Sequence, residues 1–185
     1  MYAGLIGRFA AAFVVSSFAV FALAGAMGAA VGRALPPEVR LAVAGLVFGA
    51  AFLLDLHSLR RKTWCPLTLR RQTPKAILYE HGPRRAAVAW GLDTGLVFTT
   101  YRMSSISWAL LALGLLGIAP WWEGIGYAAG FLVPLLVGCT LGPLWHGDSA
   151  TTVLAQALAK WPLAARATSV AALAAALTAV GASLA

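Results

Sequence analysis

The sequence predicts an all-helical, polytopic integral membrane protein, and three observations favour that class. Of the 185 residues, 61% are apolar and 11% are charged, whereas about 25% are charged in typical soluble domains. The mean hydropathy is +0.82. Eight of the fourteen Lys and Arg residues lie within residues 57–85, between long apolar runs. Because cytoplasmic loops of membrane proteins carry such an excess of cations, this stretch is predicted to be a basic inner loop.

A single transmembrane domain is predicted over residues 1–185. A helix needs about twenty apolar residues to cross the hydrocarbon core, so the chain has room for about six spans. The predicted spans are residues 9–31, 39–56, 86–101, 105–118, 125–145 and 163–184. Five spans are the alternative, with residues 86–118 forming one tilted or broken helix. Six spans place both termini in the cytoplasm of a bacterial plasma membrane, and five place the C-terminus outside.

Individual residues set the boundaries of these spans. Pro36-Pro37 ends the first span and starts the second, as prolines do at helix ends. Trp121-Trp122 marks a chain reversal at the membrane interface, where tryptophan is enriched. Pro134 lies inside the fifth span, where neighbouring helices can satisfy the freed carbonyl. Residues 148–161 have one apolar face and predict a short interfacial helix before the last span.

Glycine pairs four residues apart recur in the predicted spans. Such pairs leave a bare ridge on one face of a helix, so that a second backbone can approach closely. The ridges predict tight packing within the bundle, and the alternative is that one or two of them face a partner protein. The pairs are Gly28 and Gly32, Gly45 and Gly49, Gly91 and Gly95, Gly126 and Gly130, and Gly138 and Gly142.

Asp93 is the leading candidate for a substrate or ion site. A carboxylate within a span costs roughly 2.5–3.5 kcal/mol on insertion scales and needs a partner or water. If Gly91–Gly95 breaks the helix, Asp93 lies on unwound backbone of the kind that binds ions or substrates in transporters. The alternatives are a structural role near the inner interface and a contact with another subunit. The candidate binding residues are Asp93, Thr94, Thr99, Thr100, Tyr101 and Arg102.

The basic loop is a candidate surface for a cytoplasmic partner or for anionic lipid, which gains about 1 kcal/mol per nearby cation. Aromatic residues do not alternate with these cations as in strand-binding surfaces, so nucleic acid is not an expected partner. Asp55 and His57, at the end of the second span, are expected to pair with Arg60 or Arg61. The candidate contact residues are Arg60, Arg61, Lys62, Arg70, Arg71 and Lys75.

Cys65 and Cys139 raise a redox alternative, because membrane carriers exchange electrons between paired thiols. The predicted topology separates these two residues by on the order of 20 Å, whereas a disulfide needs alpha carbons within about 7 Å. The three histidines fall in different places and do not form a ligand pair at helical spacing. With no nucleophile elbow or phosphate-binding glycine loop, neither a catalytic residue nor a metal or cofactor is predicted.

Three short runs carry a family resemblance: Arg71-Gln72-Thr73-Pro74, Trp90-Gly91-Leu92-Asp93-Thr94-Gly95 and Thr99-Thr100-Tyr101-Arg102. Over residues 60–145 the chain resembles small actinobacterial-type membrane proteins of unassigned role. More distantly, it is similar to the six-span thiol-disulfide carriers of cytochrome c biogenesis. That carrier family uses membrane cysteines paired across two spans, and this chain lacks the pair, so the resemblance implies a fold more than an activity.

These observations favour a non-catalytic membrane subunit or accessory protein. It would contact the lipid bilayer and other membrane subunits through its glycine ridges and its basic loop. The first alternative is a transporter of a small solute or ion that uses Asp93. The second is a thiol-disulfide electron carrier.

Overall fold

The computed structural model describes residues 2–61, 74, 76–99, 104–146 and 150–184, and the regular elements among them are all α-helices. The predicted all-helical fold is therefore confirmed. Within these residues, three segments are long and apolar enough to cross a membrane: Gly4–Ala30, Pro37–Arg61 and Arg166–Ser183. The helices are α1 (Tyr2–Ala34), α2 (Pro37–Arg61), α3 (Ala76–Gly95), α4 (Ile106–Leu115), α5 (Glu123–His146) and α6 (Ala150–Leu184).

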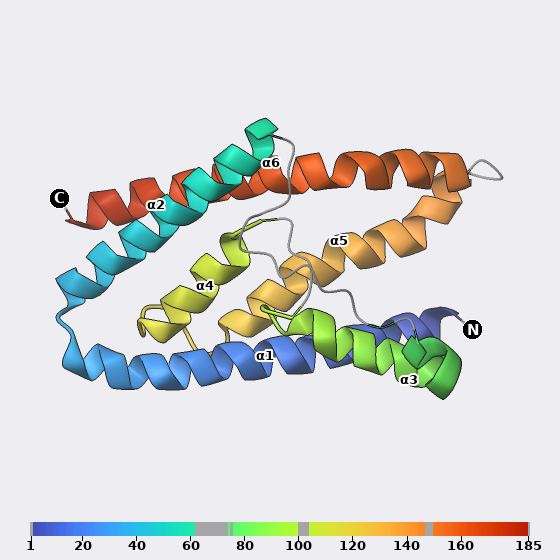
Figure 1. The fold of residues 1–185 in the computed structure, drawn as a ribbon, viewed down its shortest axis with the longest axis horizontal. Helices are drawn as coiled ribbons and strands as arrows, with labels where there is room; N and C mark the ends of the chain where they lie inside the picture. Colours follow the sequence, from blue (N-terminus) through green and yellow to red (C-terminus); the bar gives the residue numbers. More distant parts are fainter. Residues whose placement is uncertain (1, 62–73, 75, 100–103, 147–149, 185) are drawn as a thin grey trace.

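Two helix pairs form the sides of the molecule, and α4 and α5 lie between them (Figure 1). In the first pair, α1 and α3 run in the same direction, because Gly91 lies against Phe9 and Gly95 lies against Phe13. In the second pair, α2 and α6 are antiparallel. There the Asp55 carboxylate of α2 meets an early part of the α6 span, and Gly45 faces Val180 near its end.

Two apolar clusters hold α4 and α5 against these pairs. Phe48 of α2, Ala109 of α4 and Leu173 of α6 belong to one cluster. The other centres on Phe13 of α1, which is fully buried beneath α5. The Phe13 ring stacks on the rings of Phe9, Tyr127 and Phe131, and its centroid lies 4.6 Å from that of Phe131.

Helix α3 begins earlier than the predicted third span and contains a sharp kink. Gly82 has φ of 76°, a left-handed conformation that glycine adopts without steric cost. Pro83 follows, and its fixed φ suits the first position of a new helical segment. Since α2 continues to Arg61 and α3 starts at Ala76, both ends of the predicted basic loop are helical.

The predicted interfacial helix is not a separate element. From Ala150 the helix continues through Pro162 to Leu184 as the single helix α6. Proline inside a membrane helix is tolerated where other groups satisfy the freed carbonyl. The boundary predicted at residues 161–163 is therefore absent from the backbone.

Most of the glycine ridges pack within the bundle. A Cβ at Gly28 would collide with the backbone of Gly114 and Gly117, and one at Gly91 would collide with the Phe9 carbonyl. A Cβ at Gly45 or Gly49 of α2 would meet side chains of α6 at ordinary contact distance. A Cβ added at Gly126 or Gly130 would meet no neighbour within 4 Å. The side chains around the fifth pair, at 138 and 142, lie outside the described residues.

Candidate functional site

Asp55 is fully buried where α2, α4 and α6 meet. Its two carboxylate oxygens accept hydrogen bonds from the backbone N–H of Ser105, at 2.8 and 3.0 Å. The hydroxyl of Ser169 donates to Oδ2 at 2.6 Å. A single side chain of α2 thereby joins the start of α4 to α6.

The helical period of α2 explains why Asp55 is buried. Residues of α2 that recur every three or four positions are buried, and Asp55 falls on that face. Ser105 is the N-cap of α4, and its own side chain makes no capping hydrogen bond. The first N–H groups of a helix have no acceptor within the helix, and its dipole favours an anion there. Asp55 therefore supplies an acceptor to α4 from a different helix.

Helix α2 also contacts the opposite end of α4. The Arg40 guanidinium donates to the carbonyl of Gly117, just beyond the last turn of α4, at 3.4 Å. A cation is favoured at the C-terminus of a helix as an anion is at its N-terminus. The two charged groups of α2 thus match the dipole of the antiparallel α4 at both ends.

Helices α3 and α4 follow one another beside α1 and are separated by a break. The helix runs through Gly91 to Gly95 and ends there, so the break predicted within these residues is wrong and Asp93 lies on helical backbone. Gly91 lies against Phe9, and Gly114 lies further along α1 against Ala24, so both segments advance in the direction of α1. Beyond its kink α3 is about 20 Å long and α4 about 15 Å. Neither reaches the roughly 30 Å of a hydrocarbon core alone.

A cavity of about 370 Å³ lies next to this junction, between the start of α4, α5 and α6. Ser169 lines it and also hydrogen-bonds to Asp55, so one hydroxyl connects the carboxylate to this space. Pro134 has no N–H, so the carbonyl of Gly130 lacks its usual helical donor. The lining includes Ser104, Ile106, Gly130, Pro134, Thr168 and Ser169.

Asp93 and its neighbours lie in the last turn of α3 and in the segment that follows it. Asp93 and Thr94 are half-buried and each has an interaction partner. The Thr99 hydroxyl donates to the backbone carbonyl of Asp93 and, at 3.1 Å, to that of Leu96. These bonds stabilise the turn after the helix. The other three predicted residues, Thr100, Tyr101 and Arg102, lie outside the described residues.

The expectation that Asp55 pairs with Arg60 or Arg61 is wrong. Both arginines are exposed in the last turn of α2, and Asp55 points instead to Ser105 and Ser169. The spacing of Asp55 from Phe48, at seven residues, is the sequence signal that could have placed the acid on the buried face. The remaining predicted loop contacts, Lys62, Arg70, Arg71 and Lys75, lie outside the described residues.

The structure does not test the redox alternative. Cys65 lies outside the described residues, and Cys139 lies on α5 at a position whose side chain is not described. Within the described part of the chain, no three His, Cys, Asp or Glu side chains come together as a metal site would require. The polar group next to the cavity is instead a single buried carboxylate, Asp55, which accepts from the Ser105 N–H and from the Ser169 hydroxyl.

Comparison with protein-family models, with curated proteins and with solved structures finds no match. The class of protein follows from the helices themselves. Three long apolar helices and an all-helical architecture are the features of a helical membrane protein.

Proposed function

We propose that this chain is a multi-pass protein of the bacterial plasma membrane that carries a small solute or ion, with Asp55 as its binding carboxylate. The observation that supports this most strongly is a fully buried acid at the N-terminus of a half-helix, next to a cavity. Ionisable groups within membrane spans are costly and by default indicate function. Broken helices whose ends meet at a polar group form the binding sites of many transporters.

A five-crossing topology accompanies this proposal. Helices α3 and α4 share one direction, and their combined length of about 35 Å matches a single crossing. With α1, α2, α5 and α6 as the other crossings, the N-terminus is cytoplasmic and the C-terminus is outside. Arg60 and Arg61 then lie at the inner surface, about 8 Å along α2 from Asp55. The carboxylate is thus within reach of the inner side but below the headgroups.

The chemistry follows from the groups around the carboxylate. Ser169 can turn its hydroxyl between Asp55 and the cavity, because both lie within its reach. A cation or a donor group of a solute in the cavity would replace this hydroxyl as the partner of the acid. Gly130 also lines the cavity, and its carbonyl, which lacks a helical donor, would offer a second acceptor. Asp55 therefore replaces Asp93 as the leading site residue, and Asp93 remains a proposed second position on the broken segment.

Ion flux through reconstituted vesicles tests the proposal. Full-length protein in liposomes is given a proton gradient or a sodium gradient, with flux followed by an entrapped pH dye or by ²²Na⁺. We expect flux above that of empty liposomes, reduced at least tenfold by Asp55→Asn. The matched variant Glu38→Gln also removes one carboxylate, at an exposed position in the first turn of the same helix, and should retain most of the flux. Equal flux in the wild type, both variants and empty liposomes would reject ion transport.

A second candidate function is that of a non-catalytic subunit of a membrane complex, and one observation favours it. Gly126 and Gly130 are exposed on α5, with Val133 exposed on the same face one turn further along. Small residues of this kind let a second helix approach. Gly126→Leu should then remove a partner that co-purifies with the wild type in mild detergent, while the chain itself still inserts. Flux that survives Gly126→Leu but not Asp55→Asn would favour transport over this role.

A thiol-disulfide carrier is the remaining proposal, and it makes a simple prediction. If thiol exchange carries the function, Cys65→Ser combined with Cys139→Ser abolishes it. If the carboxylate site carries it, the same double variant keeps the ion flux of the wild type.

A further inference from the structure

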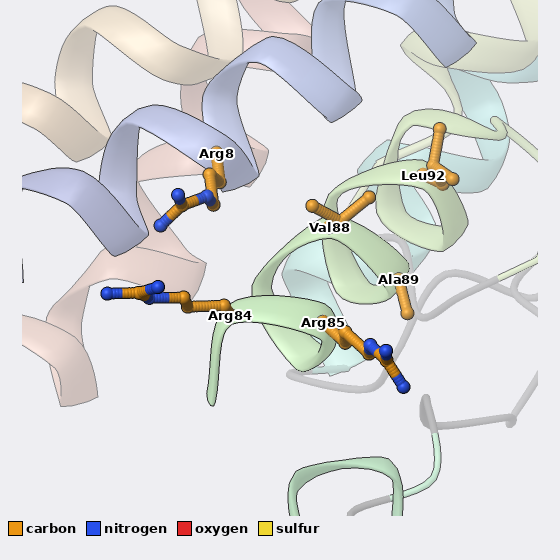
Figure 2. A pocket seen from close by; sticks show the side chains of 6 residues that line it. All are labelled: Arg8, Arg84, Arg85, Val88, Ala89 and Leu92. Atoms are coloured by element: carbon orange, nitrogen blue, oxygen red, sulfur yellow. The ribbon is translucent and has the colours of Figure 1, made fainter. Parts of the chain in front are cut away.

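A second cavity, of about 410 Å³, lies between the first turns of α1 and the segment of α3 that follows the kink. Arg8 comes from α1, whereas Arg84 and Arg85 come from α3. Figure 2 shows the side chains of Arg8 and Arg84 extending to the same side, and that of Arg85 extending away from them. Val88 lies between the two helices, and Leu92 lies further along α3. The cavity thus has cationic groups at one end and an apolar wall.

The fold explains why these residues meet. The kink at Gly82 and Pro83 starts a new helical segment, so the two arginines of α3 fall in its first turn. Close packing of Gly91 on Phe9 fixes the parallel register of α1 and α3. Positions 85, 88, 89 and 92 follow the three- and four-residue spacing of one helix face. A strip that is charged at its start and apolar beyond it therefore lines the groove.

The arginines of this groove are not neutralised within the described part of the chain. Arg8, Arg84 and Arg85 are all exposed, and no carboxylate lies among the lining residues. The nearest acid in the sequence, Glu80, lies 4.0 Å from His81. Arginine is well suited to phosphate oxygens, which its guanidinium can contact through two parallel hydrogen bonds.

We propose that this groove binds one anionic phospholipid of the inner leaflet. Its headgroup phosphate would lie between Arg8 and Arg84, and an acyl chain would follow Val88 and Leu92 along α3. The observation that selects a lipid over a free anion is the apolar wall, which inorganic phosphate would leave unused. Arg84 and Arg85 are the last two cations of the predicted basic loop, and the groove does not include Asp55. The proposal therefore rests on the proposed topology, which sets the leaflet, and not on transport.

Native mass spectrometry of the full-length protein, titrated with phosphatidylglycerol, measures this binding. We expect one tight site, with affinity reduced about tenfold or more when Arg8→Gln and Arg84→Gln are combined. The matched control combines Arg60→Gln with Arg61→Gln, which also removes two exposed cations at the end of a helix, and should leave the tight site unchanged. Equal loss in both double variants would mean that general surface charge binds the lipid, and would overturn the proposal.

Two further comparisons test whether the groove recognises a whole anionic phospholipid and not its phosphate group alone. Phosphatidylcholine, which carries the same phosphate without net charge, and inorganic phosphate should each fail to compete at equal concentration. Val88→Trp fills the apolar end but keeps every arginine, so it should also weaken phosphatidylglycerol binding. Competition by inorganic phosphate, or full binding by the Val88→Trp variant, would contradict a lipid site. Asp55→Asn should bind the lipid as the wild type does, whatever its effect on transport.

Discussion

Asp55 is the residue whose environment differs most from what its local sequence suggests. It lies shortly before a pair of exposed arginines, yet its partners are 50 and 114 positions away along the chain. A buried acid with one backbone donor and one hydroxyl donor is stabilised only while both remain. The same hydrogen bonds that hold the bundle together therefore also define the candidate site.

Replacing Asp55 tests how much its hydrogen bonds contribute to the stability of the fold. Asp55→Ala leaves the N–H of Ser105 and the hydroxyl of Ser169 without an acceptor, which should cost on the order of 3 kcal/mol. Asp55→Asn keeps one acceptor oxygen and should cost less. Denaturation in detergent micelles, followed by circular dichroism, measures both. An alanine variant as stable as the wild type would show that these bonds do not hold the three helices together.

Phe13 provides a second prediction at the same scale. Its ring is fully buried and stacks on three others, so Phe13→Ala should reduce the free energy of unfolding by about 3–5 kcal/mol. Val15 lies on the same helix with 62% of its surface exposed, and Val15→Ala is the matched control. The same unfolding measurement should show only a small effect for the control. Similar losses in the two variants would contradict the assignment of the α1–α5 core.

Helix α4 depends on its neighbours α1 and α2 for its position. Helix α4 is short, and it is fixed by Asp55 at one end, by Arg40 at the other and by close contact with α1. Such a half-helix could not be stable alone, since isolated helices shorter than about 12–15 residues are marginal even in water. Its position depends on neighbours that are distant in sequence.

Glycine substitutions test this packing. A methyl group at Gly28 would collide with the backbone of Gly114 and Gly117, which cannot move aside as a flexible side chain can. Gly28→Ala should therefore separate α1 from α4 and destabilise the protein by about 1–3 kcal/mol. The control, Gly126→Ala, introduces the same methyl group on an open face and should be neutral or slightly stabilising. Unfolding in micelles compares the two variants, and equal stability would contradict the contact.

The number of membrane crossings is a property of the whole molecule. Five crossings place the two chain ends on opposite sides of the membrane, whereas six place them on the same side. In a variant with both native cysteines replaced by serine, a cysteine at Ser183 should react with a membrane-impermeant maleimide added to intact cells. A cysteine at Gly4 should react only after the cells are opened. Protection of both positions would instead support six crossings with both termini inside.

The sequence predicted the helical class and the approximate position of most helices. Apolar runs of this length can satisfy their backbone groups in lipid only as helices, so composition alone suffices for that conclusion. The sequence predicted a third span through residue 101 or a break within Gly91–Gly95, whereas the helix continues through these glycines and ends at Gly95. The sequence did not identify Asp55 as the central buried acid. Because Arg60 and Arg61 follow it closely in the sequence, a local ion pair was the simplest expectation, whereas its actual partners come from α4 and α6.

What the sequence determined by itself was the all-helical class and the presence of helices long and apolar enough to cross a membrane, since hydropathy and helix length depend on local sequence. Only the tertiary structure decided which polar groups meet: Asp55 with Ser105 and Ser169, and Arg8 with Arg84. Such meetings depend on helix direction and register, which close glycine contacts set between segments far apart in the chain. The physical reason is that the partners of a buried charge depend on how the helices pack in three dimensions. The preference of a segment for lipid, in contrast, depends on the hydropathy of its own residues.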